Sequence, residues 1–152
     1  MNDRFKFRFF NEYSNKLESC DEYDLKDIFE SGNPVMQCTG LKDKNGKLIY
    51  EGDIVRFEET YECACFTNIK EVLFKIVWSD YSFKAKQIKI IQGNKSYEFP
   101  LTLSKLLEIE PYTEYQTTIN LEIIGNIYEN KELLEEEWII LKLNARIVAV
   151  LI

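Results

Sequence analysis

The chain has 152 residues, of which 45% are hydrophobic, 30% charged and 14% aromatic, and its formal net charge is −7. This length fits one domain with its own core, and no apolar run reaches the about 18 residues that indicate a membrane-spanning helix. Because histidine is absent, the chain lacks the usual general base near neutral pH and the commonest zinc ligand, which excludes Ser–His and Cys–His nucleophiles.

The net negative charge limits the partners that the chain can bind, and its first residues indicate where it acts. A negative surface repels phosphate backbones, so nucleic-acid binding over the whole surface is disfavoured, although a local basic face is compatible with it. The first residues alternate charge with Phe and contain no apolar core of signal-peptide length. We therefore expect a cytoplasmic protein with no membrane segment.

Residues 4–10 alternate with a period of two, which predicts a first strand. We expect its aromatic face to join the core and its basic face to meet solvent; a nucleic-acid contact through the basic face is the alternative. Residues 21–30 predict a helix capped by Asp21, because apolar residues share one face and Ser31–Pro34 ends the pattern. The alternating residues of the strand are Phe5, Phe7 and Phe9 on one face and Arg4, Lys6 and Arg8 on the other.

Residues 36–57 predict three short strands separated by two tight turns. Asn45-Gly46 predicts a β-hairpin with a type I′ turn, in which both central residues have positive φ. Glu51, Gly52 and Asp53 form the second turn, where the Asp53 carboxylate is expected to accept hydrogen bonds from backbone N–H groups rather than to act in acid–base catalysis. Asp43 to Gly46 does not fit a calcium loop, because the glycine comes too early.

Alternation in residues 71–79 and 83–91 predicts a second pair of strands, joined by a turn at residues 79–82. Val72, Phe74, Ile76 and Trp78 are expected on one face. We expect a lysine-protected strand edge beyond the turn; a nucleic-acid patch, with Tyr81 and Phe83 stacking on bases, is the alternative. The lysines concerned are Lys84, Lys86 and Lys89.

Three further elements complete the pattern. A short helix is predicted from about Thr102 to before Pro111, and a strand through residues 121–127 in which Gly125 indicates a bulge or a close approach of other backbone. Asn130 is expected to cap a short acidic helix over residues 131–137. Cys63 and Cys65 are expected to be reduced thiols, since no recognised metal spacing includes them.

Residues 138–152 form an apolar C-terminal tail, distinct from a domain over residues 1–137. The tail is too short to cross a bilayer as a helix, and its two β-favouring runs predict one or two strands. It would complete the chain's own sheet or add to that of a second copy, so we predict a homo-oligomer that uses this tail. The candidate oligomer contacts are Trp138, Ile140, Ile147, Val150 and Ile152.

The chain resembles the YopX family, small proteins encoded by phages and prophages of Gram-positive bacteria. The matching motifs are RFKFR at residues 4–8, QCTGLKDKNGK at 37–47, IYEGDIV at 49–55 and IGNIYEN at 124–130. The chain departs from the family at Phe9-Phe10, where many members have Trp, and in the tail. The resemblance implies a compact, β-rich, partly barrel-like fold and a phage setting, but no activity.

Taken together, these patterns predict an α+β fold that is mostly antiparallel β, with a partly barrel-like, SH3-like sheet and a few short helices. We expect no enzyme activity, no cofactor and no metal. The expected function is that of a phage accessory protein that binds another protein or itself. A nucleic-acid-binding module that uses the basic strand faces is the alternative.

Overall fold

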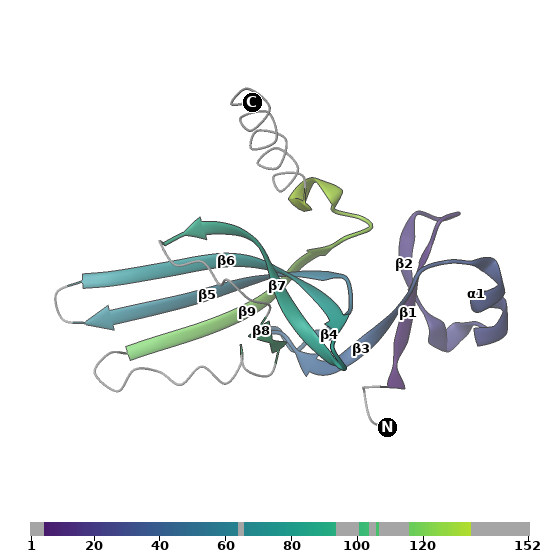
Figure 1. Cartoon of the computed structure of the whole chain (residues 1–152), viewed down its shortest axis with the longest axis horizontal. Coiled ribbons are helices and arrows are strands. Elements are labelled where there is room, and N and C mark those ends of the chain that lie inside the picture. The colour runs from purple at the N-terminus through teal and green to yellow at the C-terminus, as the bar shows by residue number, and fades with distance from the viewer. Residues whose placement is uncertain (1–4, 64–65, 94–100, 104–105, 107–115, 135–152) are drawn as a thin grey trace, which may run out of the picture.

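Two antiparallel sheets, lying side by side, form the molecule in the computed structural model, which describes residues 5–63, 66–93, 101–103, 106 and 116–134 (Figure 1). The smaller sheet has four strands in the order β2-β1-β3-β4, and the larger has five in the order β8-β7-β6-β5-β9. The smaller sheet consists of β1 (Phe7–Asn11), β2 (Lys16–Ser19), β3 (Val35–Lys42) and β4 (Leu48–Tyr50). The larger sheet consists of β5 (Asp53–Cys63), β6 (Phe66–Ser79), β7 (Ser82–Gln92), β8 (Leu101–Thr102) and β9 (Gln116–Asn126).

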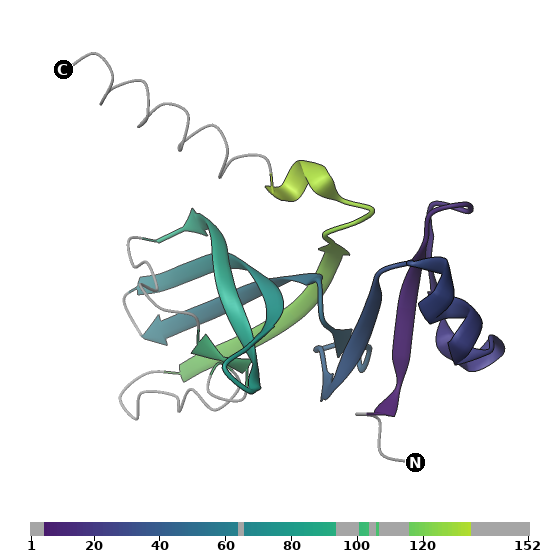
Figure 2. The same cartoon turned by 45° about the vertical axis from the view of Figure 1, so that its right-hand side comes forward.

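The helical elements that lie wholly within the described residues are short. They are the 3-10 helix η2 (Cys20–Glu22), the α-helix α1 (Leu25–Ser31) and the 3-10 helix η3 (Lys131–Leu134). The larger sheet curls into a half-barrel, and α1 lies beyond the smaller sheet at the far side of the molecule (Figure 2). The predicted α+β class, mostly antiparallel β with a barrel-like sheet, is confirmed.

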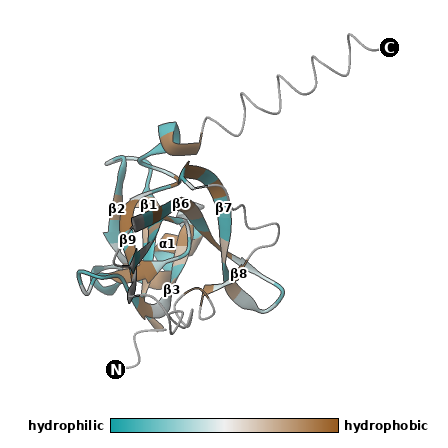
Figure 3. Ribbon diagram, turned by 90° about the vertical axis from the view of Figure 1, so that its left-hand side faces the viewer, coloured by the Kyte–Doolittle hydropathy of each residue, from teal (hydrophilic) through white to brown (hydrophobic). Residues whose placement is uncertain are grey.

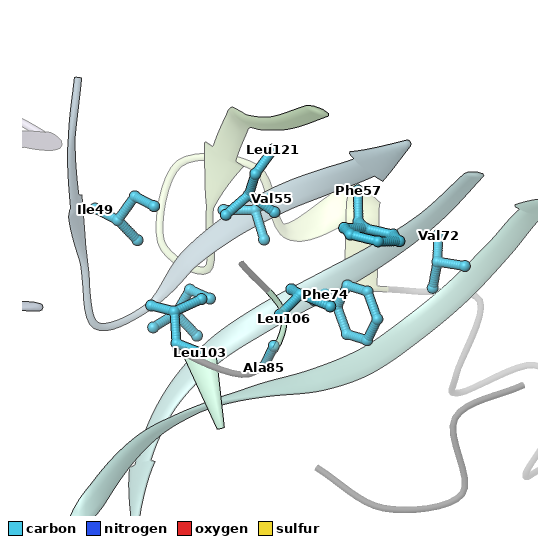
Figure 4. Close-up of a cluster of buried hydrophobic side chains, with 10 residues drawn as sticks. Ile49, Val55, Phe57, Val72, Phe74, Ala85, Leu103, Leu106 and Leu121 are labelled. Atoms are coloured by element: carbon cyan, nitrogen blue, oxygen red, sulfur yellow. The ribbon is translucent and has the colours of Figure 1, made fainter. Parts of the chain in front are cut away.

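Strand alternation builds the main core. Figure 3 shows hydrophobic and hydrophilic residues alternating along β7, because successive side chains point to opposite faces of a sheet. Figure 4 shows the inward-facing side chains converging from the strands of the half-barrel, and β4 adds Ile49 to them. Each large apolar side chain that is fully buried stabilises the fold by about 1.5–3 kcal/mol. The cluster consists of Ile49, Val55, Phe57, Val72, Phe74, Ile76, Ala85, Leu103, Leu106 and Leu121.

The first strand corrects the expected alternation. Phe9 and Phe10 are both buried, whereas Phe5 is 72% exposed. Phe9 packs with Cys20 and Ile28, and Phe10 instead stacks on Tyr128, with ring centroids 5.1 Å apart. The strand therefore has apolar contacts on both faces, because the segment after β9 covers the side that the sequence assigns to solvent.

The predicted helix over residues 21–30 is divided in two. Asp24, in extended conformation, caps α1 and its side chain accepts a hydrogen bond from the Lys26 N–H at 2.8 Å, whereas Asp21 lies in η2. Gly32 ends α1 with a φ of 73°. Only Ile28 of the expected apolar face is buried, because the helix is too short to lay more than one residue on the sheet.

The β3–β4 hairpin forms as predicted, but its turn is not type I′. Gly46 has a φ of 79°, and Asn45 is not among the described residues with positive φ. The Gly46 N–H donates to the Asp43 carbonyl at 2.9 Å, which closes a type I turn followed by a left-handed glycine. The Asp43 carboxylate selects this geometry by accepting hydrogen bonds from the N–H groups of Asn45 and Lys47, both at 2.9 Å.

The end of β9 contains the bulge that Gly125 predicts. Ile54 pairs with Gly125 while Val55 pairs with Ile123, which leaves one extra residue in β9. A Cβ atom on Gly125 would lie 2.5 Å from Oδ1 of Asn130, so only glycine allows the following turn to fold back this closely. The short helix begins after Asn130, as predicted, as a 3-10 helix over Lys131–Leu134.

Thr102 lies in β8 rather than at a helix cap, while Leu103 and Leu106 have helical backbone and are buried. The rest of that predicted helix and residues 135–137 of the predicted acidic helix lie outside the described residues.

Candidate functional site

The tip of the β6–β7 hairpin holds non-glycine residues in a left-handed conformation. Ser79 pairs with Ser82, so Asp80 and Tyr81 form a two-residue loop, and their φ values are 47° and 61°. Positive φ at both central residues is the type I′ arrangement, and it costs about 1–2 kcal/mol for each residue with a side chain. Tyr81 is also 96% exposed, so the fold holds a large aromatic side chain in solvent at an energetic cost.

Two more aromatic residues flank this tip. Trp78 and Phe83 are cross-strand partners, and their rings meet edge to face with centroids 4.8 Å apart. Trp78 remains 50% exposed although it continues the row of Val72, Phe74 and Ile76, which are fully buried. The row leaves the core at its end, because β6 extends past the half-barrel's interior there.

A groove opens beside the hairpin tip, between β3 and the β6–β7 hairpin. We call it the aromatic groove; it encloses about 300 Å³. Its apolar walls include Leu41 of β3 and Trp78 and Phe83 of the β6–β7 hairpin. Its polar side chains are neutral amides and hydroxyls. None of its lining residues carries a formal charge. The lining residues are Gln37, Thr39, Leu41, Trp78, Tyr81, Ser82, Phe83, Thr102 and Leu103.

Two charged groups beside the hairpin tip pair with each other. Lys84 forms an ion pair with Asp80, and this hydrogen bond lowers the pKa of the Asp80 carboxyl below its ordinary value. The Asp80 side chain is 82% exposed and that of Lys84 only 16%. Of the other candidate lysines on β7, Lys86 is exposed and Lys89 is half-buried. The basic character that the sequence suggests for this strand is therefore reduced at the hairpin tip.

Arg8 does not face solvent, contrary to the expectation for the first strand. Its Nη2 atom lies 2.6 Å from Oδ1 of Asp53 and 3.4 Å from the Glu51 carbonyl, and its guanidinium carbon lies 4.6 Å from the centre of the Tyr50 ring. The side chains of Asp53 and Arg8 are only 1% and 12% exposed. This ion pair links β1 of the smaller sheet to β5 of the larger one.

The Asp53 carboxylate also has the structural role predicted for it. Its Oδ2 atom accepts a hydrogen bond from the Tyr50 N–H at 2.8 Å. Burial raises the pKa of Asp53, and the positive charge of Arg8 opposes that rise. Arg4 lies outside the described residues, and Lys6 is half-buried. A nucleic-acid contact by Arg4, Lys6 and Arg8 stays a prediction, but Arg8 is already committed to the junction between the sheets.

The β3–β4 turn docks on the open edge of β9. The Lys44 N–H donates to the Leu121 carbonyl at 2.8 Å, and Oδ2 of Asp43 accepts from the Ile123 N–H at 3.2 Å. Burial raises the pKa of the Asp43 carboxyl, but hydrogen bonds from the N–H groups of Lys47, Ile123 and Asn45 hold that pKa below its ordinary value. The turn covers part of a strand edge that would otherwise present unpaired backbone groups.

Glu122 strengthens this docked edge on the outer face. Its Oε2 atom accepts from Nζ of Lys44 at 2.8 Å and from Nη2 of Arg56 at 2.5 Å. These two hydrogen bonds lower the pKa of Glu122 to about 2.

A second cavity, of about 400 Å³, lies at the junction near Arg8, Asp53 and Glu129. Three of its four charged lining residues have structural contacts, Lys47 being the fourth: Arg8 and Asp53 pair with each other, and Glu129 accepts hydrogen bonds from the Leu17 N–H at 3.3 Å and from the Asn126 amide at 2.6 Å. The junction cavity is therefore a structural feature of the contact between the sheets.

Several candidate groups have no ligand arrangement in the described part of the chain. Cys20 and Cys38 are buried free thiols. Among the described residues, no three His, Cys, Asp or Glu side chains are placed to share a metal ion. No helix within those residues is long and apolar enough to cross a membrane. The side chains of Cys63 and Cys65 lie outside the described residues, as do the tail and its proposed contacts Trp138, Ile140, Ile147, Val150 and Ile152.

The aromatic groove is the feature that sequence reasoning misses. Alternation assigns Trp78 to the core face, and the sequence names Tyr81 and Phe83 only as part of the alternative nucleic-acid patch, without a groove. The usable signal is the placement of an aromatic residue inside a two-residue turn that lacks glycine, since such a turn favours Asn and Gly.

The chain is similar to a protein family and to a solved structure. A family model described as YopX protein matches residues 6–135. The crystal structure of protein EF1440 from Enterococcus faecalis is similar, with 23% identity and a TM-score of 0.47 over 86% of this chain and 97% of that one. No curated protein matches the sequence.

Proposed function

Because the chain belongs to the YopX family, we propose that it is an accessory protein of a phage or prophage that binds another protein in the host cytoplasm. The binding site in this proposal is the aromatic groove. The resemblance of the sequence motifs to that family supports the proposed setting, and the geometry of the groove supports the proposed mode of action.

The exposed aromatic side chains at the hairpin tip carry the proposal. Trp and Tyr are enriched among the residues that dominate binding energy at protein interfaces, because they bury a large area with few rotatable bonds. Tyr81 is 96% exposed and Trp78 50% exposed, and both border a hollow that a partner side chain can fill. A turn that holds Tyr81 in solvent against its backbone preference is consistent with selection for contact rather than for stability.

The chemistry of the groove favours binding over catalysis. Its lining offers neutral amides, hydroxyls and rings, without a carboxylate, thiol or amine to act as acid, base or nucleophile. Lys84 and Asp80, beside the hairpin tip, pair with each other and so leave little net charge there. These features support recognition of a largely uncharged surface.

Nucleic-acid binding is the second candidate, since exposed rings at the hairpin tip can stack on the bases of a single strand and Lys86 of the same hairpin is exposed. The net charge of −7 and the pairing of Lys84 with Asp80 weigh against it. The two candidates differ in salt dependence. Binding that relies on phosphate contacts falls steeply between about 50 and about 200 mM salt, whereas binding through apolar contacts does not.

Affinity capture from lysogenic cells with matched variants tests the proposal. We expect a partner protein to be recovered by the unaltered chain and by Tyr13→Ala, which removes a side chain that is 102% exposed on another turn. Trp78→Ala and Tyr81→Ala should lose that partner, and moderate salt and nuclease should leave it bound. Equal recovery by all variants, or recovery that nuclease abolishes, would count against the proposal.

A further inference from the structure

The size of the aromatic groove restricts the shape of what it can hold. An amphipathic helix presents anchors over two turns, at positions i to i+7, which span about 10 Å at 1.5 Å per residue. The groove encloses about 300 Å³, which is close to the lower limit of about 300 Å³ for small-molecule pockets. It therefore accommodates a few side chains of a narrow segment rather than the face of a helix.

Strand addition has too little open edge beside the groove. On this side of the larger sheet, β8 already pairs with β7, with Thr102 opposite Lys84 and Leu101 opposite Ala85. Only Ser82 and Phe83 of β7 extend beyond that pairing toward the hairpin tip. Two residues are too few for the main-chain ladder on which β-augmentation depends.

The groove's chemistry also excludes a ligand recognised by charge. Phosphorylated and acidic motifs need clustered arginines, and none lines this groove. What it offers instead is flat rings beside hydrogen-bond donors. Among the described residues, no hydrogen bond uses the indole N–H of Trp78 or the hydroxyl of Tyr81, so both donors are available to a ligand carbonyl.

A polyproline II segment has the complementary features. Its proline rings pack on aromatic faces, and its carbonyls lack internal hydrogen bonds and accept from side-chain donors. The Trp78 side chain is held before binding by its edge contact with Phe83, and the type I′ turn fixes the backbone of Tyr81. Such preorganisation reduces the entropy lost on association. The net charge of −7 favours a basic residue beside the prolines.

We infer that the aromatic groove binds an extended, proline-containing segment of the partner protein, flanked by a basic residue. This inference rests on the proposed function and specifies the class of its partner.

Nuclear magnetic resonance on the full-length chain tests the inference. The probe is an acetylated octaproline peptide ending in lysine amide, and the control is a Gly-Ser repeat peptide of equal length with the same end. The indole signal of Trp78 is assigned by its loss in Trp78→Phe. We expect a saturable shift of that indole signal and of the Ser82 and Phe83 amides with octaproline only.

Matched variants separate the groove from the rest of the surface. We expect Trp78→Ala to weaken octaproline binding about tenfold or more, as for a central interface aromatic, and Tyr13→Ala to leave it unchanged. Amide spectra confirm that each variant is folded. In Tyr81→Phe, which keeps the ring and removes the donor, binding should fall by less than in Trp78→Ala.

Three results would overturn the inference: no saturable shift, equal shifts with the Gly-Ser peptide, or shifts with an oligothymidine strand at low salt that exceed those with octaproline. The result of the octaproline titration can be distinguished from the result of the capture experiment that tests the proposed function. If capture depends on Trp78 and Tyr81 while octaproline does not bind, protein binding stands and the proline class is wrong.

Discussion

Removing Arg8 tests whether the two sheets depend on the buried ion pair at their junction. Arg8→Met keeps most of the apolar stem and removes the charge, which leaves the Asp53 carboxylate unpaired while its side chain is 1% exposed. Breaking a buried pair in this way costs about 3–5 kcal/mol, a large part of the about 5–15 kcal/mol that stabilises a typical domain. We expect the free energy of unfolding to fall by an amount in the former range.

Urea denaturation at neutral pH, followed by circular dichroism, measures this loss. Lys26→Met is the control, because its ion pair with Glu30 spans 3.7 Å between side chains that are 76% and 67% exposed, and losing such an exposed pair costs at most about 1 kcal/mol. If Arg8→Met were no more destabilising than the control, the junction would not depend on this pair.

The same variant has a pH signature. Burial already raises the pKa of Asp53, and Arg8→Met removes the positive charge and the side-chain hydrogen bond that oppose that rise, leaving the Tyr50 N–H and the charge of Lys47 to oppose it. A group whose pKa is higher in the folded than in the unfolded protein favours folding as pH falls, because the folded state binds its proton more tightly. The deficit of Arg8→Met relative to the unaltered chain should therefore shrink as the pH is lowered toward the ordinary range of a carboxyl.

Three further substitutions test other parts of the fold by the same denaturation assay. Gly46→Val should cost about 1–3 kcal/mol, since φ is 79° and no atom lies near the new Cβ, so a stability equal to that of the unaltered chain would refute a backbone cause. Gly125→Ala should lower the free energy of unfolding by about 1–3 kcal/mol, because the new Cβ clashes with Asn130. The loss should be smaller when Asn130→Ala is already present, and strictly additive losses from the two substitutions would argue against the contact. Glu122→Gln should destabilise most above about pH 4.5 and progressively less toward pH 2, because the folded pKa of about 2 lies below the ordinary 4.5; a deficit independent of pH would contradict this.

The sequence predicts most of the strands because alternation directly reports burial on one face. Residues 71–79 and 83–91 form β6 and β7 as expected, and the predicted positions of both hairpins are correct. The alternation fails at Phe10, since a segment more than a hundred residues later supplies its contact with Tyr128. Local pattern carries no information about that distant partner.

The turns show the same limit. Asn45-Gly46 has the composition of a type I′ turn, yet the Asp43 carboxylate imposes a type I turn by binding the following N–H groups. The type I′ geometry occurs instead at Asp80-Tyr81, where composition disfavours it and the register of β6 and β7 leaves two residues for the loop. Strand register overrides turn propensity at the hairpin tip, which is also where the aromatic groove forms.

The candidate site depends on contacts between elements and was for that reason the least predictable feature. Arg8 belongs to a basic stripe in the sequence. In the structure it instead forms the ion pair at the junction of the two sheets, with Asp53, which lies forty-five positions later. Likewise, Trp78 belongs to a core row whose end becomes a wall of the groove only because β3 lies opposite. Pairing between distant segments creates the groove, and neither segment alone indicates it.

Photo-cross-linking at position 81 tests protein binding through the aromatic groove most directly. The chain carrying Tyr81→p-benzoylphenylalanine is irradiated in lysogenic cells, with Tyr13→p-benzoylphenylalanine as the equally exposed control. We predict that a partner protein is joined to position 81 and not to position 13, and that adding Trp78→Ala abolishes the adduct. Adducts of equal yield at both positions, an adduct with nucleic acid, or none with protein at position 81 would contradict the account.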